Sequence, residues 1–173
     1  MANVNVSNNR AGEDGGAIYV NGNHTTIRNV TSLSNTAKRG GSTFINGDHT
    51  TVYNCTLDNN NATLRGGGLN VAGNDLIIYD LEVSNNRAAE MGGAIYIRSD
   101  HLEFRNINST DNSAKLGGST FINGTNITVH DCIFDGNNAT LRGGGLNVAG
   151  DNCTVYNVEV SDNIAGTDGG AVY

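Results

Sequence analysis

The chain is poor in several residue types, and each shortage narrows what it can be. It has no proline, no tryptophan and only three cysteines among 173 residues, and three cysteines do not make a disulfide scaffold. No apolar run approaches the roughly 18 residues of a membrane-spanning helix, so we expect no membrane insertion. The sequence has ten basic and 17 acidic residues, for a net charge of −7, and this acidic balance argues against nucleic acid as a partner. The first ten residues have no basic start and no apolar core, so no signal peptide is visible.

A Gly-Gly pair recurs along the whole chain at intervals of 25 or 26 residues. The pairs begin at Gly15, Gly40, Gly66, Gly92, Gly117, Gly143 and Gly169. An Asn-x-Ala marker runs in step with them, at Asn9, Asn35, Asn60, Asn86, Asn112, Asn137 and Asn163. A composition rich in glycine and asparagine and low in aromatics could suggest disorder, but two markers with one period indicate a solenoid, a propeller or a similar array.

A longer repeat of 77 residues contains three of these units. Residues 15–91 align with residues 92–168 without a gap, and about 44 of the 77 positions are identical. Recent duplication and deliberate repetition would both give this pattern. We therefore expect one repeat domain over residues 1–173, with two triplets, 15–91 and 92–168, and partial coils at both ends.

Each unit reads as strands rather than helix. β-branched residues and asparagine dominate, and no helical stripe persists. Apolar residues alternate after each Gly pair, as at Ile18 and Val20, and two more short strands are expected around Ile27 and Val30. Three strands in 25 or 26 residues predict an all-β fold, a right-handed parallel β-helix of about six to seven coils. A propeller blade needs about 40 residues and a leucine-rich repeat needs a leucine scaffold, so both fit less well.

The repeated polar residues are expected to hold coils together. The seven marker asparagines should stack at a turn, where their amides bond one another and satisfy backbone groups. A second polar column is expected to form an inward ladder at a bend: Asn29, Asn54, Asp80, Asn106, Asp131 and Asn157. Rows of metal or sugar ligands are the alternative, but binding sites are few per protein whereas every coil carries these residues.

The three cysteines are expected to be free. Cys55 and Cys132 are 77 residues and hence three coils apart, too far for a disulfide. A bridge between Cys132 and Cys153 across the core is conceivable. Buried thiols that act as small apolar side chains are favoured.

Aromatic and arginine residues mark a candidate ligand face on the outside of the first strands. Its members are Tyr19, Phe44, Tyr96, Phe121, Arg39 and Arg65. Exposed rings beside arginines suit sugar rings or a protein partner, and the two arginines could grip an acidic glycan. The alternative is that the rings stack on one another and cover small neighbours. Tyr53, Tyr79 and Tyr156 form a second outward group, with Arg28 and Arg105.

No catalytic residue, metal or cofactor is predicted. A catalytic site needs unlike groups that converge, whereas this repeat supplies rows of like groups. His24, His49 and His101 should share one turn with Asp75 nearby, as solvated residues or as a surface metal site. Asp14 and Asp168 precede Gly pairs, but their spacing does not match a calcium-binding repeat.

The repeat units resemble a known family. The GGA[IV] units at residues 15–18, 92–95 and 169–172, and the hydrophobe-x-x-Asn units such as 134–137, resemble the GGAI and FxxN repeats of polymorphic outer-membrane proteins. The asparagine- and threonine-rich, proline-free style is similar to adhesin-like β-helix proteins of methanogenic archaea. The resemblance spans nearly the whole chain and implies a role in surface adhesion or as a structural stalk.

We therefore expect a non-enzymatic module at the cell surface or outside the cell, in adhesion or in a fibre. Its partners would be a glycan or a cell-surface molecule, and a second copy end to end, because open solenoid ends carry unpaired strand groups. A polysaccharide-binding or polysaccharide-cleaving protein with the pectin-lyase-like fold is the alternative. An ice-binding face is a third, since Thr26, Thr51, Thr128 and Thr154 form an outward column, although Ile77 and Glu103 interrupt it.

Overall fold

The computed structural model describes all 173 residues and consists of strands and turns, without a helix. Its strands form three parallel sheets, which we call sheets A, B and C. Sheet A contains β1 (Ala2–Ser7), β3 (Thr26–Leu33), β6 (Thr51–Asp58), β9 (Leu76–Ser84), β12 (Leu102–Thr110), β15 (Ile127–Asp135) and β18 (Cys153–Ser161). Sheet B contains β4 (Thr36–Arg39), β7 (Asn61–Arg65), β10 (Arg87–Ala88), β13 (Ser113–Leu116), β16 (Asn138–Arg142) and β19 (Ile164–Ala165). Sheet C contains β2 (Ile18–Asn21), β5 (Thr43–Asn46), β8 (Leu69–Ala72), β11 (Ile95–Arg98), β14 (Thr120–Asn123) and β17 (Leu146–Ala149).

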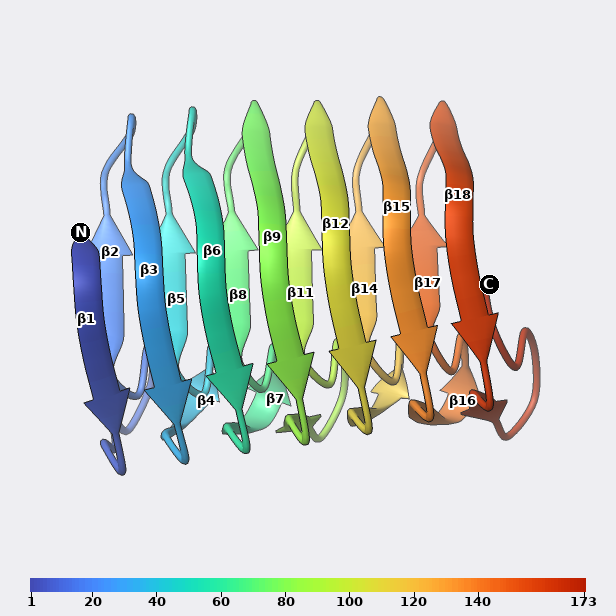
Figure 1. Ribbon diagram of the computed structural model, residues 1–173, viewed down its shortest axis with the longest axis horizontal. Helices are drawn as coiled ribbons and strands as arrows, with labels where there is room; N and C mark the ends of the chain where they lie inside the picture. Colours follow the sequence, from blue (N-terminus) through green and yellow to red (C-terminus); the bar gives the residue numbers. More distant parts are fainter.

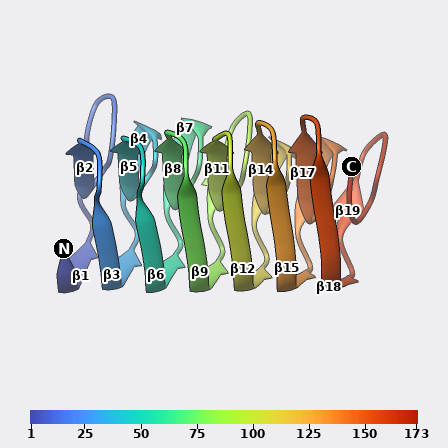
Figure 2. The ribbon, with the colours of Figure 1, turned by 90° about the horizontal axis from the view of Figure 1, so that it is seen from above.

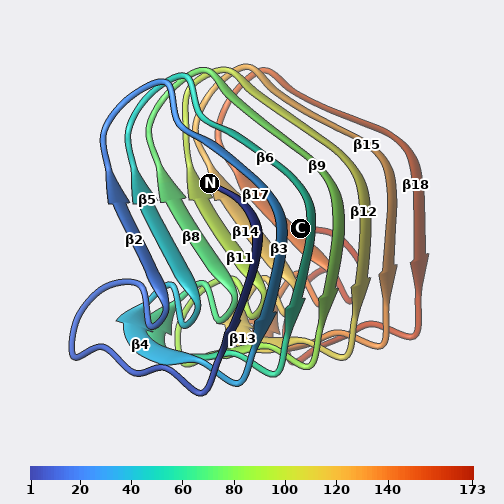
Figure 3. The ribbon, with the colours of Figure 1, turned by 60° about the vertical axis from the view of Figure 1, so that its left-hand side comes forward.

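Successive coils visit the three sheets in the same order. In Figure 3 the chain runs down sheet A, crosses the bottom of the view in sheet B and returns upward in sheet C. The coils lie side by side in chain order from β1 to β18 (Figures 1 and 2). Their registers pair equivalent positions, so that Tyr79 lies between Tyr53 and Arg105. The predicted parallel β-helix with three strands per coil is confirmed, and no helix is present that could cross a membrane.

The three strands of a coil are not the three that the sequence pattern predicted. The segments expected as separate strands around Ile27 and Val30 form one long strand, β3. Asn29 lies between them with a φ of +52°, a left-handed conformation that asparagine tolerates and that bends the strand without ending it. The third strand lies instead in sheet B, and in β4 it begins directly after the marker residue Asn35, in a segment that we predicted to be a turn.

The polar column at this bend faces solvent, so the prediction of an inward ladder was wrong. Its exposed members are Asn54, Asp80, Asn106, Asp131 and Asn157. The positive φ at Asn29 explains this, because residues 28 and 29 turn away from the core while Ile27 and Val30 both remain buried. The column still links coils, since Asn54 Nδ2 donates to Asn29 Oδ1 at 2.8 Å.

Apolar side chains from sheets A and C form one continuous core of 25 buried residues. Phe104 and Phe134 are its largest fully buried members. Sheet B contributes only alanines, and Ala62, Ala88 and Ala114 form a separate small cluster. The Gly pairs bring two backbones together here, because a Cβ on Gly67 would lie 2.6 Å from a backbone oxygen of the neighbouring coil.

All three cysteines are free, as predicted, and Cys55 and Cys132 are buried. Burial raises the pKa of the Cys132 thiol to about 11 and also raises the pKa of Cys55. Cys153, near the end of the chain, is only partly buried.

This difference predicts selective labelling of the native protein by a thiol reagent near pH 8. We expect Cys153 to react, although burial raises its pKa too, because a reagent can reach it, whereas Cys55 and Cys132 are covered and should react only after unfolding. The number of labelled thiols, counted by mass spectrometry, measures this. Cys153→Ser should remove the native reaction, and labelling of all three thiols in the folded state would contradict the prediction.

Candidate functional site

The seven marker asparagines lie in one file at the corner between sheets A and B, and the central five are buried. The backbone N–H of Asn60 and its Nδ2 donate to Asn86 Oδ1, at 2.9 and 3.0 Å. Asn86 Nδ2 donates in turn to the Leu57 carbonyl at 2.7 Å. The same amide-to-amide bonds link the other members of the file, Asn9, Asn35, Asn112, Asn137 and Asn163. These amides are used inside the solenoid and are not presented to a ligand.

The predicted ligand face on the outside of sheet C is largely covered. Phe44, Tyr96 and Phe121 are only 7%, 6% and 7% exposed, so the prediction that they are open to solvent was wrong. Tyr19, in the first coil, is 56% exposed. The rings stack in pairs along the axis, with centroids 5.6 Å apart for Tyr19 and Phe44 and 5.7 Å apart for Tyr96 and Phe121.

Arginines at the ends of the sheet B strands close over these rings. The guanidinium carbon of Arg39 lies 5.0 Å from the Phe44 ring centre, and that of Arg65 lies 5.1 Å from the Tyr96 ring centre. Arg39 also donates to both carboxylate oxygens of Asp14, each at 2.7 Å, and this contact raises the pKa of Arg39. Arg39 is therefore occupied by Asp14 rather than free for an acidic glycan. Arg65 donates to the Tyr96 hydroxyl at 3.4 Å, and its Nε is buried without a partner.

The outer face of sheet A carries a more open set of side chains, which we call the aromatic row: Tyr53, Tyr79, Arg105, His130 and Tyr156. Tyr53 and Tyr79 stack with ring centres 4.9 Å apart, and the Arg105 guanidinium lies 4.2 Å from the Tyr79 ring centre. His130 stacks on Tyr156 at 4.8 Å. Because ring faces meet within the row, ring edges and tyrosine hydroxyls are what it presents to solvent.

Carboxylates hold the charged members of this row in place. His130 Nδ1 lies 2.7 Å from Asp131 Oδ2, and its Nε2 lies 3.9 Å from Glu103 Oε1. Glu103 also accepts a hydrogen bond from Arg105 Nε at 2.8 Å. The hydrogen bond from His130, helped by Asn157, lowers the pKa of Asp131, which is therefore a fixed negative charge beside the row.

An open hollow of about 460 Å³ lies at the edge of sheet A where its strands begin, and we call it the edge hollow. The side chains that define it are His49, Thr51, Asp75, Ile77, His101 and Glu103. Ile77 is 39% exposed, so the hollow combines an aliphatic surface with polar groups around it.

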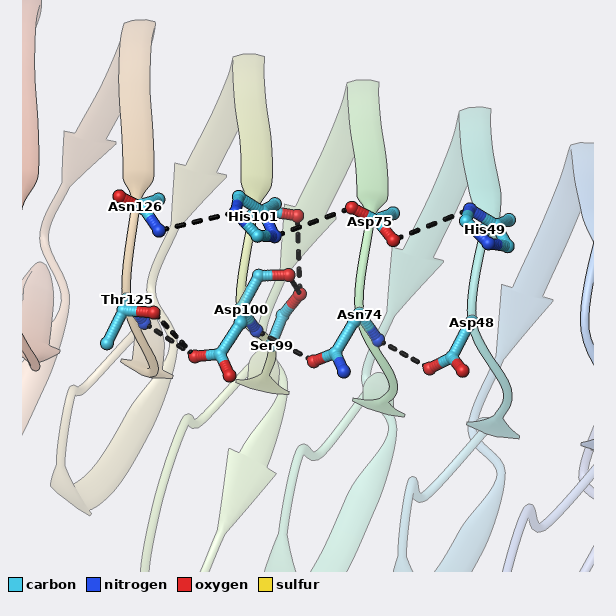
Figure 4. A network of polar contacts seen from close by, with 9 residues as sticks. All are labelled: Asp48, His49, Asn74, Asp75, Ser99, Asp100, His101, Thr125 and Asn126. Carbon is cyan, nitrogen blue, oxygen red and sulfur yellow. Dashed lines mark hydrogen bonds and ion pairs between the residues drawn. The ribbon is translucent and has the colours of Figure 1, made fainter.

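Four residues of successive coils form a file along this hollow, which we call the histidine file: His49, Asp75, His101 and Asn126 (Figure 4). His49 Nδ1 and His101 Nδ1 lie 3.6 and 3.5 Å from the two carboxylate oxygens of Asp75. Asn126 Nδ2 lies 3.3 Å from His101 Nε2. All four have a φ between +53° and +63°, because each sits at the tight turn that leads into sheet A. The sequence predicted this shared turn for the histidines and Asp75.

A second file, one residue earlier in each coil, fixes these turns (Figure 4). Asp48 Oδ1 accepts the Asn74 N–H at 2.8 Å, and Asn74 Oδ1 accepts the Asp100 N–H at 3.0 Å. Asp100 Oδ1 accepts the hydroxyl and the N–H of Thr125, at 2.8 and 3.0 Å, and these bonds lower the pKa of Asp100. The turn backbone is thus anchored below the file that faces the hollow.

The histidine file does not form the surface metal site that the sequence left open. No group of three or more His, Cys, Asp and Glu side chains in the structure is arranged to hold a metal ion. Thr51, Ile77 and Glu103 of the hollow were recognised in the sequence only as one outward column. Their association with the histidine file depends on how the turn folds, which the spacing of the repeats does not reveal.

Comparison with models of protein families shows which family this chain belongs to. Residues 1–168 match the family model described as a right-handed beta helix region. The chain belongs to the right-handed β-helix family. Searches of curated proteins and of solved structures found no match. Membership of the β-helix family establishes the fold and its right-handed winding, whereas function depends on the side chains on the outer surface of the coils.

Proposed function

We propose that this β-helix is a non-enzymatic glycan-binding module that works outside the cell in adhesion, with a polysaccharide held along the outer face of sheet A. The observation that carries the proposal is the edge hollow, where an exposed aliphatic side chain is surrounded by carboxylates, imidazoles and a hydroxyl. Sugars have apolar C–H faces and a rim of hydroxyls, so a surface of this kind is complementary to them. The resemblance of the repeats to those of surface adhesins points the same way.

The aromatic row extends the proposed surface along the solenoid. Its tyrosine edges and the neighbouring carboxylates supply further hydrogen-bonding groups in coil after coil. A repeating polymer suits such a repeating surface, because successive sugar units can meet similar groups on successive coils. A catalytic role is less well supported, because the polar side chains on this face are mostly paired with equivalents in the next coil.

Attachment to a cell surface and end-to-end association of two copies stay predictions. Both follow from the repeat pattern rather than from a contact within the structure. The sheet C face, which the sequence offered as a possible ligand face, is not part of the proposal because most of its rings are covered.

The proposal predicts that Ile77→Arg abolishes glycan binding. A long charged side chain would fill the edge hollow, and we expect at least about a tenfold loss of affinity, since a desolvated apolar contact is replaced by a steric obstacle. Glycan-array screening followed by calorimetry with the best glycan measures it. Ile164→Arg is the matched control, because Ile164 is 62% exposed in sheet B and therefore lies off the proposed face. Absence of any glycan binding, or equal loss in both variants, would contradict the proposal.

A further inference from the structure

The carboxylate of Asp75 differs in its surroundings from the carboxylates of three other aspartates on sheet A. Asp58, Asp80 and Asp131 each accept a hydrogen bond from an amide or hydroxyl in the following coil. Asp75 has only the two imidazole contacts, at 3.6 and 3.5 Å, which are too long for good hydrogen bonds. Its side chain is 48% exposed and lines the edge hollow. Its lone pairs are therefore free to accept hydrogen bonds from a ligand.

The imidazoles flank this carboxylate on either side. His49 approaches one oxygen and His101 the other, so the group lies between two flat rings along the axis of the solenoid. A carboxylate held with both oxygens available can accept two parallel hydrogen bonds. A pair of adjacent hydroxyls on a sugar ring offers donors in that arrangement.

The charges of the hollow favour a neutral ligand over a charged one. Two carboxylates, Asp75 and Glu103, line it in a chain of net charge −7, so an anionic sugar would be repelled. Glu103 already has Arg105 as its cation at 2.8 Å, and Asp75 lies between two imidazoles. An ammonium group at Glu103 would have to displace Arg105, whereas a hydroxyl needs only a free acceptor such as Asp75.

We infer that the edge hollow is a subsite for a neutral sugar residue, whose adjacent hydroxyls bind the carboxylate of Asp75 while its C–H face rests on Ile77. This inference rests on the proposed function and names its ligand class and its principal acceptor. Thr51 and Glu103 lie within reach of the remaining hydroxyls, because they line the same hollow. Hydrogen bonds to a charged acceptor are about twice as strong as neutral ones, so Asp75 should dominate the polar recognition.

The test is calorimetric titration of the intact chain, at constant pH and ionic strength, with four probes: cellohexaose, mannohexaose, galacturonate hexamer and glucosamine hexamer. We expect at least one neutral hexamer to bind, and both charged hexamers to bind more weakly. Asp75→Asn should weaken the neutral complex by about tenfold or more, because it replaces a charged acceptor with a neutral amide. Asparagine tolerates the φ of +56° at this position, so the turn is kept.

Asp111→Asn is the matched control. It makes the same substitution at an exposed residue with a φ of +54°, directly after β12 at the opposite end of sheet A from the hollow, and it should leave affinity unchanged. A preference for either charged hexamer, or equal effects of the two substitutions, would overturn the inference. Glycan binding that Ile77→Arg abolishes but Asp75→Asn leaves intact would overturn the role of Asp75 and leave the proposed function standing, whereas no binding to any oligosaccharide would overturn both.

Discussion

Gly67→Ala is expected to destabilise the solenoid by about 3 to 5 kcal/mol, among the largest effects of a single methyl group. Gly67 is buried at the corner between sheets B and C, where the backbone of the next coil runs directly against it. A Cβ would lie 2.6 and 2.7 Å from backbone atoms of Arg87 and closer still to the carbonyl of Gly93. Neither neighbour is a flexible side chain, so relief of the clash requires whole strands to move apart.

Thermal unfolding followed by circular dichroism measures the effect, which should lower the Tm by roughly 10 °C in a chain of this length. Gly170→Ala is the matched control, because Gly170 occupies the same position of the last coil and a Cβ there would meet nothing closer than 3.5 Å. We expect the control to change stability by no more than about 0.5 kcal/mol. Similar Tm values for the two variants would show that the close approach of backbones is not what requires glycine.

The spacing of the Gly pairs and of the marker asparagines was enough to predict the fold. A position that must be glycine, or must be an amide, in every coil reports a stacking constraint, and stacking at one period defines a solenoid. The sequence also placed the histidines and Asp75 on one turn, because residues 25 or 26 apart in a β-helix become neighbours. These inferences depend on the period alone, and they require no knowledge of the coil's shape.

What the sequence did not reveal depends on the shape of the coil. Alternation along a strand predicts which residues point inward, but the positive φ at Asn29 and its equivalents shifts the alternation by one residue. That shift turned the second polar column outward. Phe44 and Tyr96 do point outward from sheet C, yet they are buried because Arg39 and Arg65, from the ends of sheet B, fold over them.

The edge hollow likewise could not be predicted from the sequence, because it depends on the shape of the coil. Ile77 and Glu103 interrupt a column of outward threonines, and the interruption counts against an ice-binding face. The turn brings this column beside the histidine file, so that the two interruptions become the aliphatic surface and one acceptor of the hollow. A break in a repeated column is therefore the signal in the sequence for the binding site that we propose, because a ligand needs unlike groups in one place.

Asn86→Ala is expected to cost about 2 to 4 kcal/mol, because it leaves buried backbone groups without partners. Asn86 Oδ1 accepts both the backbone N–H and the Nδ2 of Asn60, and its own Nδ2 donates to the Leu57 carbonyl. An unsatisfied buried donor or acceptor costs about 1 to 3 kcal/mol. The site is 1% exposed, so solvent does not replace the amide, and equilibrium unfolding in guanidinium chloride should show a lower midpoint.

Asn9→Ala tests whether position in the file decides the cost. Asn9 has the same side chain at the exposed first coil, where its amide donates to Asn35 Oδ1 at 3.0 Å and water can reach the remaining groups. Its removal should cost less than about 1 kcal/mol, since Asn35 Oδ1 keeps the backbone N–H of residue 9 as a donor at 2.8 Å. Equal losses of stability at the two positions would mean that the asparagines act through their preference for the turn conformation. A ladder that holds one coil to the next requires a larger loss at the buried Asn86 than at Asn9.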